Sequence, residues 1–433
     1  MPIVRISEVK NYKDKQVTIQ GWVANVRSSG KIVFLQLRDG SAGLLQAVVT
    51  ALVANKEVGY WKTAGLLTIE SSVQVIGTVK AESRAPGGFE LEVTDLQLVH
   101  QAAEYPIGKK EHGPDFLLNN RHLWLRSQRQ AAIMRVRDSI IWALREFFRK
   151  EGFIMTDTPI LTPTSCEGTT TLFETDYFDE KAYLSQSGQL YLEALCMALG
   201  KVYDFGPTFR AEKSKTRRHL TEFWMLDAEM AFFDLDASID LQERMVVYVV
   251  QKVLSDCAPE LALLKRDTAP LQKVKAPFIR MTYGEALQEL KKLGSDIEWG
   301  TDLGNDDETL LTKAHDRPIF ITRYPAAIKA FYMKPDPQDA KLALCADMLA
   351  PEGYGEVIGG SQRIDDLALL EDRIKENKLK RDDFEWYLDL RRYGSVPHAG
   401  FGIGLERTVA WMCGLNHVRE TIPFPRLLNR LRP

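Results

Sequence analysis

The 433-residue sequence has few cysteines and no long apolar run. Its cysteines are odd in number, far apart, and form no C-x-x-C pair, which argues against a disulfide framework and against a zinc site. They are Cys166, Cys196, Cys257, Cys345 and Cys413. The N-terminal residues MPIVRISEVKNYKDK lack the apolar core of a signal peptide, and no stretch approaches the length of a membrane span. These absences favour a reducing, cytoplasmic location.

The chain as a whole also lacks a strong charge of either sign. Its formal net charge is −3, and its 27% charged and 45% hydrophobic residues are typical of a globular protein of two or three domains. The charges are distributed unevenly. Residues 1–100 carry 11 Lys or Arg against 9 Asp or Glu, and residues 101–150 carry 10 against 5. A basic first third is a mild indication of an end that faces a polyanion.

Residues 1–102 are predicted to form a small β-barrel. Segments rich in β-branched or aromatic residues alternate with turn signals, and one helix is expected between the third and fourth strands. This order describes an OB-fold, whose open face binds single-stranded nucleic acid. On that face Arg27, Phe34 and Gln46 offer a cation, a stacking ring and an amide. A barrel that binds no nucleic acid is the alternative. The predicted strands are 17–24, 31–38, 44–50, 72–80 and 89–100, and the predicted helix is 53–65.

Residues 103–132 are expected to be a hinge or linker, because they are rich in turn formers. The basic residues at its end would contact phosphates or simply be solvated. From 133 to 150 apolar residues recur at spacings of three and four, which predicts an amphipathic helix ended by Gly152. A strand broken by Pro159 follows. These elements begin a second domain, 133–433, in which the acidic, turn-rich stretch 276–320 is predicted to be an inserted subdomain.

The most informative stretch, 202–233, is predicted to be two strands joined by a basic loop. Arg210 and Glu212 on the first arm are two residues apart, as are Asp227 and Glu229 on the second, so a strand would point each pair to one face. The loop residues are Lys213, Lys215, Arg217, Arg218 and His219. Acids at the base and cations at the tip suit a substrate that is both phosphorylated and cationic. A hairpin with solvated charges is the alternative.

Three further stretches carry candidate ligand groups. A polar loop, 164–173, with Glu167 as its only charge, precedes Ser187 and Gln189, which are uncharged hydrogen-bonding groups at a strand end. Asp347 and Glu356 suit Mg²⁺, which prefers oxygen ligands, although isolated acids are more often surface residues. The stretch 394–414 is predicted to be a glycine-alternating strand followed by a helix that carries Arg407.

In this order the stretches resemble the three motifs of the class II aminoacyl-tRNA synthetases. The long helix and proline-broken strand resemble motif 1, F-R-A-E with its basic loop resembles motif 2, and GFGIGLER resembles motif 3. Behind an OB-fold they are similar to the aspartyl, asparaginyl and lysyl subgroup over essentially the whole chain. The resemblance implies an α+β fold: an N-terminal OB-fold barrel, then a class II catalytic domain with an antiparallel sheet flanked by helices. It also implies a homodimer formed through motif 1.

Shorter strings bear on the amino acid. Aspartyl enzymes read Q-L-[FY]-K, whose lysine pairs with the substrate carboxylate, whereas this chain has Leu192 after Gln189-Leu190-Tyr191. The strings EGYGEVIGGSQR, IKAFYM and YGSVPHAGFGIGLER are similar to those of bacterial asparaginyl enzymes. Asp227 is a departure, since many asparaginyl enzymes have Glu there. We predict that Leu192 causes the rejection of aspartate, because it supplies no second cation beside Arg363.

Three alternatives remain open from the sequence. The first is an aspartyl enzyme of relaxed specificity, which Leu192 disfavours. The second is an asparagine synthetase derived from this family, which would lack the OB domain. The third is a non-catalytic tRNA-binding paralogue, which would be expected to have lost Arg210, Arg407 or the acids.

The resemblance implies that ATP activates L-asparagine, which is then transferred to the 3′ end of tRNA(Asn). Arg210, bridging the α-phosphate and the substrate carboxylate, and Arg407, holding the γ-phosphate, are the implied catalytic residues. The other implied ATP contacts are Glu212, Arg218, His219, Phe223 beneath the adenine, Glu356 and Gly404. The implied amino-acid contacts are Glu167, Ser187, Gln189, Asp227 and Arg363. The implied Mg²⁺ ligands are Asp347 and Glu356, and the implied anticodon contacts are Arg27, Phe34 and Gln46.

Overall fold

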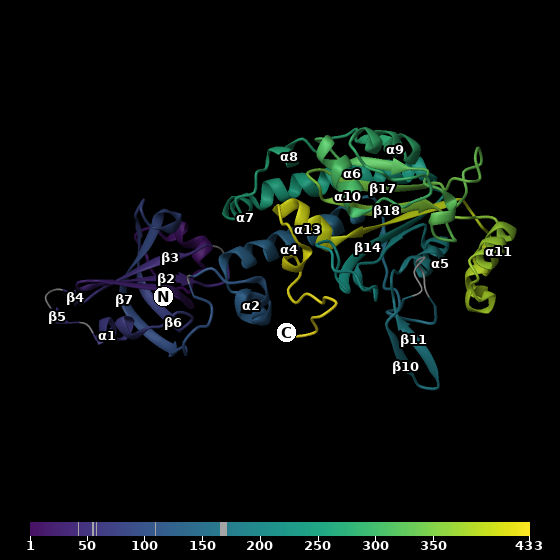
Figure 1. Cartoon of the computed structure of the whole chain (residues 1–433). Coiled ribbons are helices and arrows are strands. Elements are labelled where there is room, and N and C mark those ends of the chain that lie inside the picture. The colour runs from purple at the N-terminus through teal and green to yellow at the C-terminus, as the bar shows by residue number, and fades with distance from the viewer. Residues whose placement is uncertain (42, 54–55, 58, 109, 165–170) are drawn as a thin grey trace. The chain divides into compact units, whose positions relative to one another are not determined.

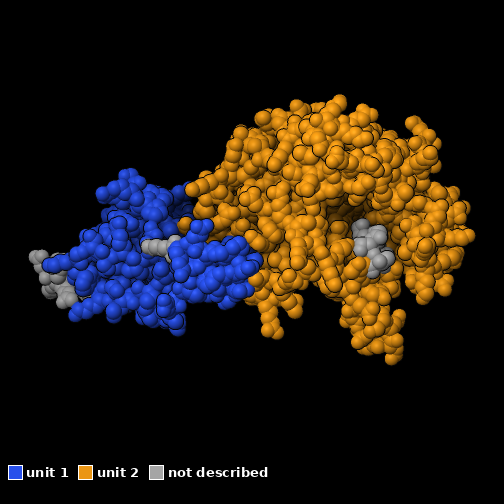
Figure 2. Space-filling model, in the orientation of Figure 1, with its two compact units in different colours: residues 1–124 blue, residues 125–433 orange. Residues whose placement is uncertain are grey.

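The computed structural model describes residues 1–41, 43–53, 56–57, 59–108, 110–164 and 171–433. The chain divides into two compact units, residues 1–124 and 125–433 (Figure 2). Among the described residues no helix combines the length and the apolar character that a membrane span requires.

The first unit contains a closed barrel in the order β1-β2-β3-β7-β6, which confirms the OB-fold. Alternate residues of its strands fill the interior: Val33, Leu35 and Leu37 are buried, while Phe34 between them is half-buried. The strands are β1 (Gln16–Ser29), β2 (Ile32–Arg38), β3 (Leu45–Thr50), β6 (Ser72–Ala81) and β7 (Phe89–His100), preceded by the 3₁₀ turn η1 (Ile6–Tyr12), with η2 (Pro86–Gly88) before β7.

The helix expected at 53–65 lies between the third and fourth barrel strands but begins later. It is α1 (Gly59–Leu66), and the residues before it form the two-stranded ribbon β4 (Leu52–Val53) and β5 (Lys56–Glu57).

The predicted linker, 103–132, is partly helical. It contains α2 (Pro114–Asn119), α3 (Arg121–Trp124) and the start of α4 (Gln128–Lys150). Pro114 occupies the first turn of α2, and the Ser127 hydroxyl caps α4 by accepting from the backbone N–H of Gln130. The residues interpreted as turn formers are therefore helix-start signals, because proline and serine suit those positions.

The second unit is organised around a nine-stranded sheet. Eight strands follow the order β15-β16-β17-β18-β19-β14-β12-β8, and β13 pairs with β14. The central pairs are antiparallel, as predicted, whereas the outer pairs β15–β16 and β12–β8 are parallel. The strands are β8 (Ile154–Met155), β12 (Lys201–Tyr203), β13 (Gly206–Phe209), β14 (Glu222–Ala231), β15 (Ile279–Thr282), β16 (Ile319–Thr322), β17 (Cys345–Ala350), β18 (Gly355–Gln362) and β19 (His398–Gly404).

The two faces of this sheet differ because successive side chains alternate. On β14, Leu226 and Met230 enter the main core with helices α4, α6 and α13, and α6 lies over β17 and β18 (Figure 1). Asp227 and Glu229 face a cavity. The remaining helices are α5 (Gln189–Leu199), α6 (Leu235–Asp256), α7 (Ala258–Leu263), α8 (Ala269–Gln272), α9 (Tyr283–Lys292), α10 (Asn305–Ala314), α11 (Leu367–Glu376), α12 (Glu385–Arg392) and α13 (Leu405–Cys413), with the 3₁₀ turns η3 (Ala326–Ile328), η4 (Arg381–Phe384) and η5 (Val418–Glu420).

The motif 1 region follows the prediction at its helix and at the break in its strand, but the two pieces of the strand join different sheets. Helix α4 ends at Lys150, and Gly152 has a φ of +80°. The expected strand is divided around Pro159, which cannot donate to a ladder, into β8 and β9 (Leu161–Thr162). β8 joins the central sheet, whereas β9 joins a three-stranded sheet with β10 (Glu174–Tyr177) and β11 (Glu180–Leu184).

The stretch 276–320 was predicted to be an inserted subdomain, but it supplies the edge of the central sheet. β15 and β16 extend that sheet beyond β17, and buried Tyr283, Leu287 and Leu311 share one core with Cys345 of β17. The acidic composition arises partly from the first turn of α10, where acids face the positive end of the helix dipole.

Candidate active site

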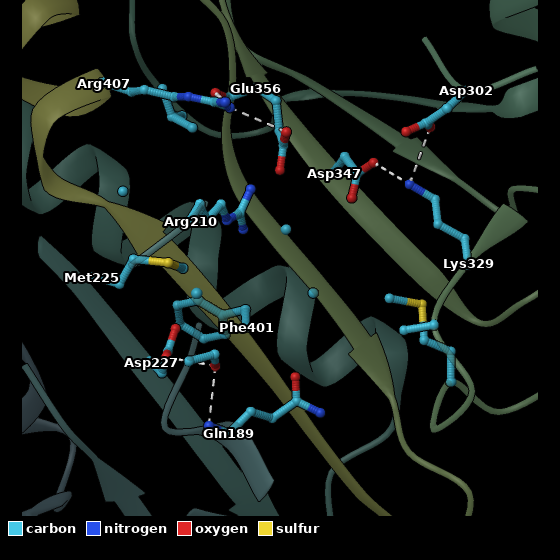
Figure 3. A pocket seen from close by; sticks show the side chains of 18 of the residues that line it. Gln189, Arg210, Met225, Asp227, Asp302, Lys329, Asp347, Glu356, Phe401 and Arg407 are labelled. Atoms are coloured by element: carbon cyan, nitrogen blue, oxygen red, sulfur yellow. Dashed lines mark hydrogen bonds and ion pairs between the residues drawn. The ribbon is translucent and has the colours of Figure 1, made fainter. Parts of the chain in front are cut away.

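A cavity of about 450 Å³ lies in the second unit, over the polar face of β14, β17, β18 and β19. Figure 2 shows the hollow in this unit, and Figure 3 shows part of its lining. Glu212 is not among its lining residues, and Glu167 lies outside the described part of the chain. The predicted site residues that line it are Ser187, Gln189, Arg210, Arg218, His219, Phe223, Asp227, Asp347, Glu356, Arg363, Gly404 and Arg407.

Two glycines of β19 make room for the two acids of β14. Asp227 pairs in register with Gly402, and Glu229 pairs with Gly400. A Cβ atom at either glycine would collide with the carboxylate across from it. The glycine alternation before Arg407 therefore has a steric cause, since any side chain there would displace an acid from the cavity.

The first charged group of the cavity consists of Arg407, Glu356 and Asp347. Arg407, in the first turn of α13, donates from Nη1 to the Glu356 carbonyl oxygen at 2.8 Å and lies 3.2 Å from Glu356 Oε2 (Figure 3). Asp347 accepts from Lys329 Nζ at 2.9 Å. Burial raises the pKa of Asp347 to about 6; the Lys329 ammonium opposes this rise and the Glu356 carboxylate adds to it.

Strand β13 ends at Phe209, so Arg210 lies one residue beyond it. The argument that a strand points Arg210 and Glu212 to one face therefore does not apply, and Glu212 lies in the loop. The Arg210 guanidinium carbon is 5.5 Å from the centre of the Phe223 ring. In Figure 3, Arg210 lies between the Glu356–Arg407 group and Asp227 with Gln189.

Arg218 is engaged by α10 and the loop before β18. Its Nη1 donates to Glu308 Oε2 at 2.6 Å, and its Nη2 donates to the Gly353 carbonyl at 2.7 Å. Burial raises the pKa of Glu308 to about 7, and Glu356 adds to the rise. Burial lowers the pKa of His219, and the cations Arg407 and Arg210 lower it further. Sequence reasoning missed Glu308, because nothing in the stretch 276–320 indicated contact with the basic loop.

A buried ion pair between Arg363 and Glu229 forms another part of the wall. Arg363 donates from Nε to Glu229 Oε1 at 3.1 Å and from Nη2 to Oε2 at 3.0 Å, while its Nη1 donates to Ser361 Oγ at 2.6 Å. Burial raises the pKa of Glu229, and Arg363 opposes the rise. Arg363 was predicted as a site residue. Glu229 was not, although its spacing of two from Asp227 already placed both acids on one face.

Asp227 organises the residues between β11 and α5. The Ser187 hydroxyl donates to Asp227 Oδ2 at 2.9 Å, and the backbone N–H of Gly188 donates to the same oxygen at 3.1 Å. Asp204, which accepts from the backbone N–H of Asp227 at 3.3 Å, has its pKa raised to about 7 by burial and then by the Asp227 carboxylate.

Leu192 does not lie in this cavity. It is fully buried in a small cluster with Cys196 and Val202. This corrects the prediction that Leu192 excludes aspartate, because helix α5 turns that position toward β12. Conversely, Lys329 lines the cavity and was not predicted; the string IKAFYM contained the only signal for it.

In the first unit, Arg27 and Phe34 pair across β1 and β2. The Arg27 guanidinium carbon lies 4.9 Å from the centre of the Phe34 ring, and Gln46 donates to Glu90 Oε2 at 2.9 Å. A second such pair, Arg38 over Trp22 at 4.8 Å, was not predicted. The barrel thus presents cation-backed aromatic rings, which suit the stacking of bases.

Comparison with known families accounts for both units. Residues 113–428 match the family of class II tRNA synthetases (D, K and N), and residues 17–99 match the OB-fold nucleic acid binding domain. The asparagine--tRNA ligase of Pelotomaculum thermopropionicum is 57% identical over 433 residues, which is 100% of each chain. The chain belongs to the class II asparagine--tRNA ligases. The family and subgroup predicted from the motifs are confirmed.

Other members of the asparagine--tRNA ligases agree over the full length. The ligase of Desulforamulus reducens is 57% identical over 428 residues, or 99% of each chain. The crystal structure of asparaginyl-tRNA synthetase from Pyrococcus horikoshii complexed with asparaginyl-adenylate is 48% identical, covers 99% of each chain and has a TM-score of 0.96. The OB domain and the catalytic-domain architecture therefore both belong to this ligase family.

Proposed function

We propose that the chain activates L-asparagine with ATP in this cavity and transfers the asparaginyl group to the 3′ end of tRNA(Asn). The observation that carries the proposal is a single cavity that combines Arg210 and Arg407 with the buried pair Arg363–Glu229. The first two residues suit phosphates, and the pair suits a neutral amide. Activation and selection then take place on one polar face of the sheet.

The activation step requires charge neutralisation rather than a side-chain nucleophile. The asparagine carboxylate attacks the α-phosphorus in line, and the bond to the bridging oxygen of the departing pyrophosphate breaks. Arg210 contacts both the carboxylate and the α-phosphate, while Arg407 holds the γ-phosphate. Their charges stabilise the negative charge that develops on the phosphoryl oxygens, and Phe223 orients the adenine by stacking.

The amide of asparagine presents one acceptor oxygen and one donor NH₂ group. Arg363 supplies the donor and Glu229 supplies the acceptor, while each keeps its bonds to the other. Aspartate carries a carboxylate in place of the side-chain amide, and this charge would lie close to Glu229 and Asp227. Burying that charge without a full partner costs several kcal/mol, so selection rests on Arg363–Glu229 rather than on Leu192.

Asp347 and Glu356 fit a magnesium site. A Cβ atom on Gly359 would lie 3.1 Å from Glu356 Oε1 and 3.6 Å from Asp347 Oδ1, so both carboxylates converge on the space above this glycine. When bound, Mg²⁺ would neutralise phosphate charge, and these two side chains would hold it. Asp347→Asn should raise the Mg²⁺ concentration needed for half-maximal pyrophosphate exchange, whereas an unchanged requirement would remove Asp347 from the ligand set.

The two units have separate tasks in this proposal. Residues 1–102 read the anticodon, with Arg27, Phe34 and Gln46 contacting bases by stacking and hydrogen bonding. Residues 133–433 carry out both chemical steps. Because charging tRNA is part of protein synthesis, a cytoplasmic location remains our expectation.

A homodimer formed through motif 1 is supported by the exposed edge of the sheet. β8 is an edge strand whose Ile154 and Met155 are both exposed, and Arg145 of α4 contacts the Met155 sulfur at 2.9 Å. Trp142 on the same helix is 65% exposed. Exposed apolar side chains along a strand edge are typical of a surface that a second chain covers. A sedimentation mass of one chain at working concentration would contradict this.

The proposed function is tested by charging. The purified chain, given ATP, Mg²⁺ and a tRNA(Asn) transcript, should attach labelled asparagine to the 3′ end, and Arg407→Ala should reduce the rate of attachment by about 10²–10³. Labelled aspartate should give little product. Aspartate charging at a comparable rate, or no charging with an intact fold, would contradict the proposal.

A further inference from the structure

A second buried acid, Glu193 of α5, lies close to Glu229: one carboxylate oxygen of each and a ring nitrogen of His398 are within 4.8 Å of one another. None of the Glu193 side chain is exposed. The Tyr387 hydroxyl donates to its Oε2 at 2.7 Å, and Arg391 Nη2 donates to the same oxygen at 2.7 Å. His398 Nε2 lies 3.0 Å from Oε2. These donors come from α12 and β19, so Glu193 is held from two directions.

The fourth partner of Glu193 is a cavity residue. Gln189, four residues earlier on the same helix, donates from Nε2 to Glu193 Oε1 at 3.1 Å. Gln189 lines the cavity, and its side chain is labelled in Figure 3. Among the described residues no donor bonds to its other amide atom, Oε1.

Glu193 decides which way the Gln189 amide points. An ionised carboxylate can only accept hydrogen bonds, so the Gln189 NH₂ group faces Glu193 and the carbonyl oxygen is left to the cavity. Burial disfavours ionisation, but Arg391 and His398 together hold the pKa of Glu193 below its usual range. The carboxylate therefore keeps its acceptor character at working pH. Both carboxylate oxygens of Glu193 already accept hydrogen bonds, so the buried charge is stabilised by these side chains without a bound metal ion.

We propose that Glu193 is a positioning residue, which fixes the Gln189 carbonyl oxygen as an acceptor for the α-ammonium group of the substrate. This inference rests on the proposed function. It accounts for a fully buried acid that touches no substrate. In Glu193→Gln, the new side-chain amide has an NH₂ donor as well as an acceptor oxygen. The Gln189 amide can then flip, so that its carbonyl oxygen accepts from position 193. The NH₂ group of Gln189 would then face the substrate ammonium group, and two hydrogen-bond donors cannot bond to each other.

The test compares two ligands that differ only at the ammonium group. Asparagine carries it, and succinamate has the same carboxylate and amide with hydrogen in its place. In ATP–pyrophosphate exchange, Glu193→Gln should raise the KM for asparagine about 10- to 100-fold, the range for losing one hydrogen bond to a charged group. The inhibition constant of succinamate should change less than about threefold. Glu193→Asp, which keeps a shortened carboxylate, should shift the asparagine KM in the same direction by less.

Glu243→Gln is the matched control, since Glu243 is also a buried acid and accepts from the backbone N–H of Phe278 at 2.7 Å. It should leave both ligands unaffected. Equal weakening of asparagine and succinamate in Glu193→Gln, or in Glu193→Asp if the first variant does not fold, would overturn the positioning role. An inactive wild-type chain would instead contradict the proposed function, so the two failures are distinguishable.

Discussion

Arg363 and Glu229 form a two-bond ion pair, at 3.0 and 3.1 Å, in the wall of the cavity. Removing the Glu229 charge should weaken discrimination against aspartate, because the side-chain carboxylate of that substrate would then meet Arg363 without the repulsion of Glu229. We expect Glu229→Gln to raise kcat/KM for aspartate relative to asparagine by about tenfold or more, which corresponds to about 1.4 kcal/mol. Parallel pyrophosphate exchange measures the ratio, and a ratio equal to that of the wild type would place selection elsewhere.

Arg210→Ala and Arg407→Ala should each reduce adenylate formation by about 10²–10³ while leaving the fold intact, because each removes charge that stabilises the phosphoryl oxygens. Lys215→Ala is the matched control, since Lys215 is an exposed cation of the same basic loop. Pyrophosphate exchange and a thermal unfolding curve measure the two effects. Near-normal exchange in either arginine variant would contradict the assigned roles.

Phe34→Ala should weaken tRNA charging by about 1–3 kcal/mol, the usual contribution of one stacked base. Pyrophosphate exchange without tRNA should not change, because the barrel takes no part in adenylate formation. Gln20→Ala, an exposed barrel residue bonded to Gln74, serves as the control. If Phe34→Ala lowered exchange as much as charging, Phe34 would be a structural residue.

Asp204 makes the stability of the chain depend on pH. Its folded pKa of about 7 lies above the ordinary value of 3.8, so the folded state binds the proton more tightly than the unfolded state. Folding stability is therefore lost as the pH rises from the ordinary pKa of 3.8 to the folded pKa of about 7. Asp204→Asn should remove this loss and stabilise the chain by a few kcal/mol at about pH 8, with much less effect at about pH 5. Urea unfolding at both values measures it, and equal gains would contradict the assignment.

The barrel and the long helix could be predicted from the sequence because their signals are local. Alternation around Val33, Leu35 and Leu37 and turn residues between strands predict β1, β2, β3, β6 and β7, and a 3.6-residue period predicts α4. The stretch 276–320 was misjudged because its strands join the sheet through long-range pairing, which composition does not report.

The site was predictable where motif residues carry the chemistry and less so where geometry decides. Arg210 and Arg407 follow from their motifs. Glu229 was placed on one face with Asp227 but was given no role, because only its pairing with Arg363 distinguishes it from an ordinary strand acid. Leu192 was wrongly expected to act in the pocket. The absence of a lysine shows which group the pocket lacks, but it does not show on which face of α5 the side chain lies.

The most direct test of the central claim, activation of asparagine in this cavity, is wild-type ATP–pyrophosphate exchange with asparagine and aspartate in parallel. We predict exchange that depends on asparagine, with kcat/KM for aspartate lower by about 10² or more, as expected when a site built for an amide must bury an extra charge. Exchange of equal efficiency with aspartate, or exchange that depends on neither amino acid, would contradict the account.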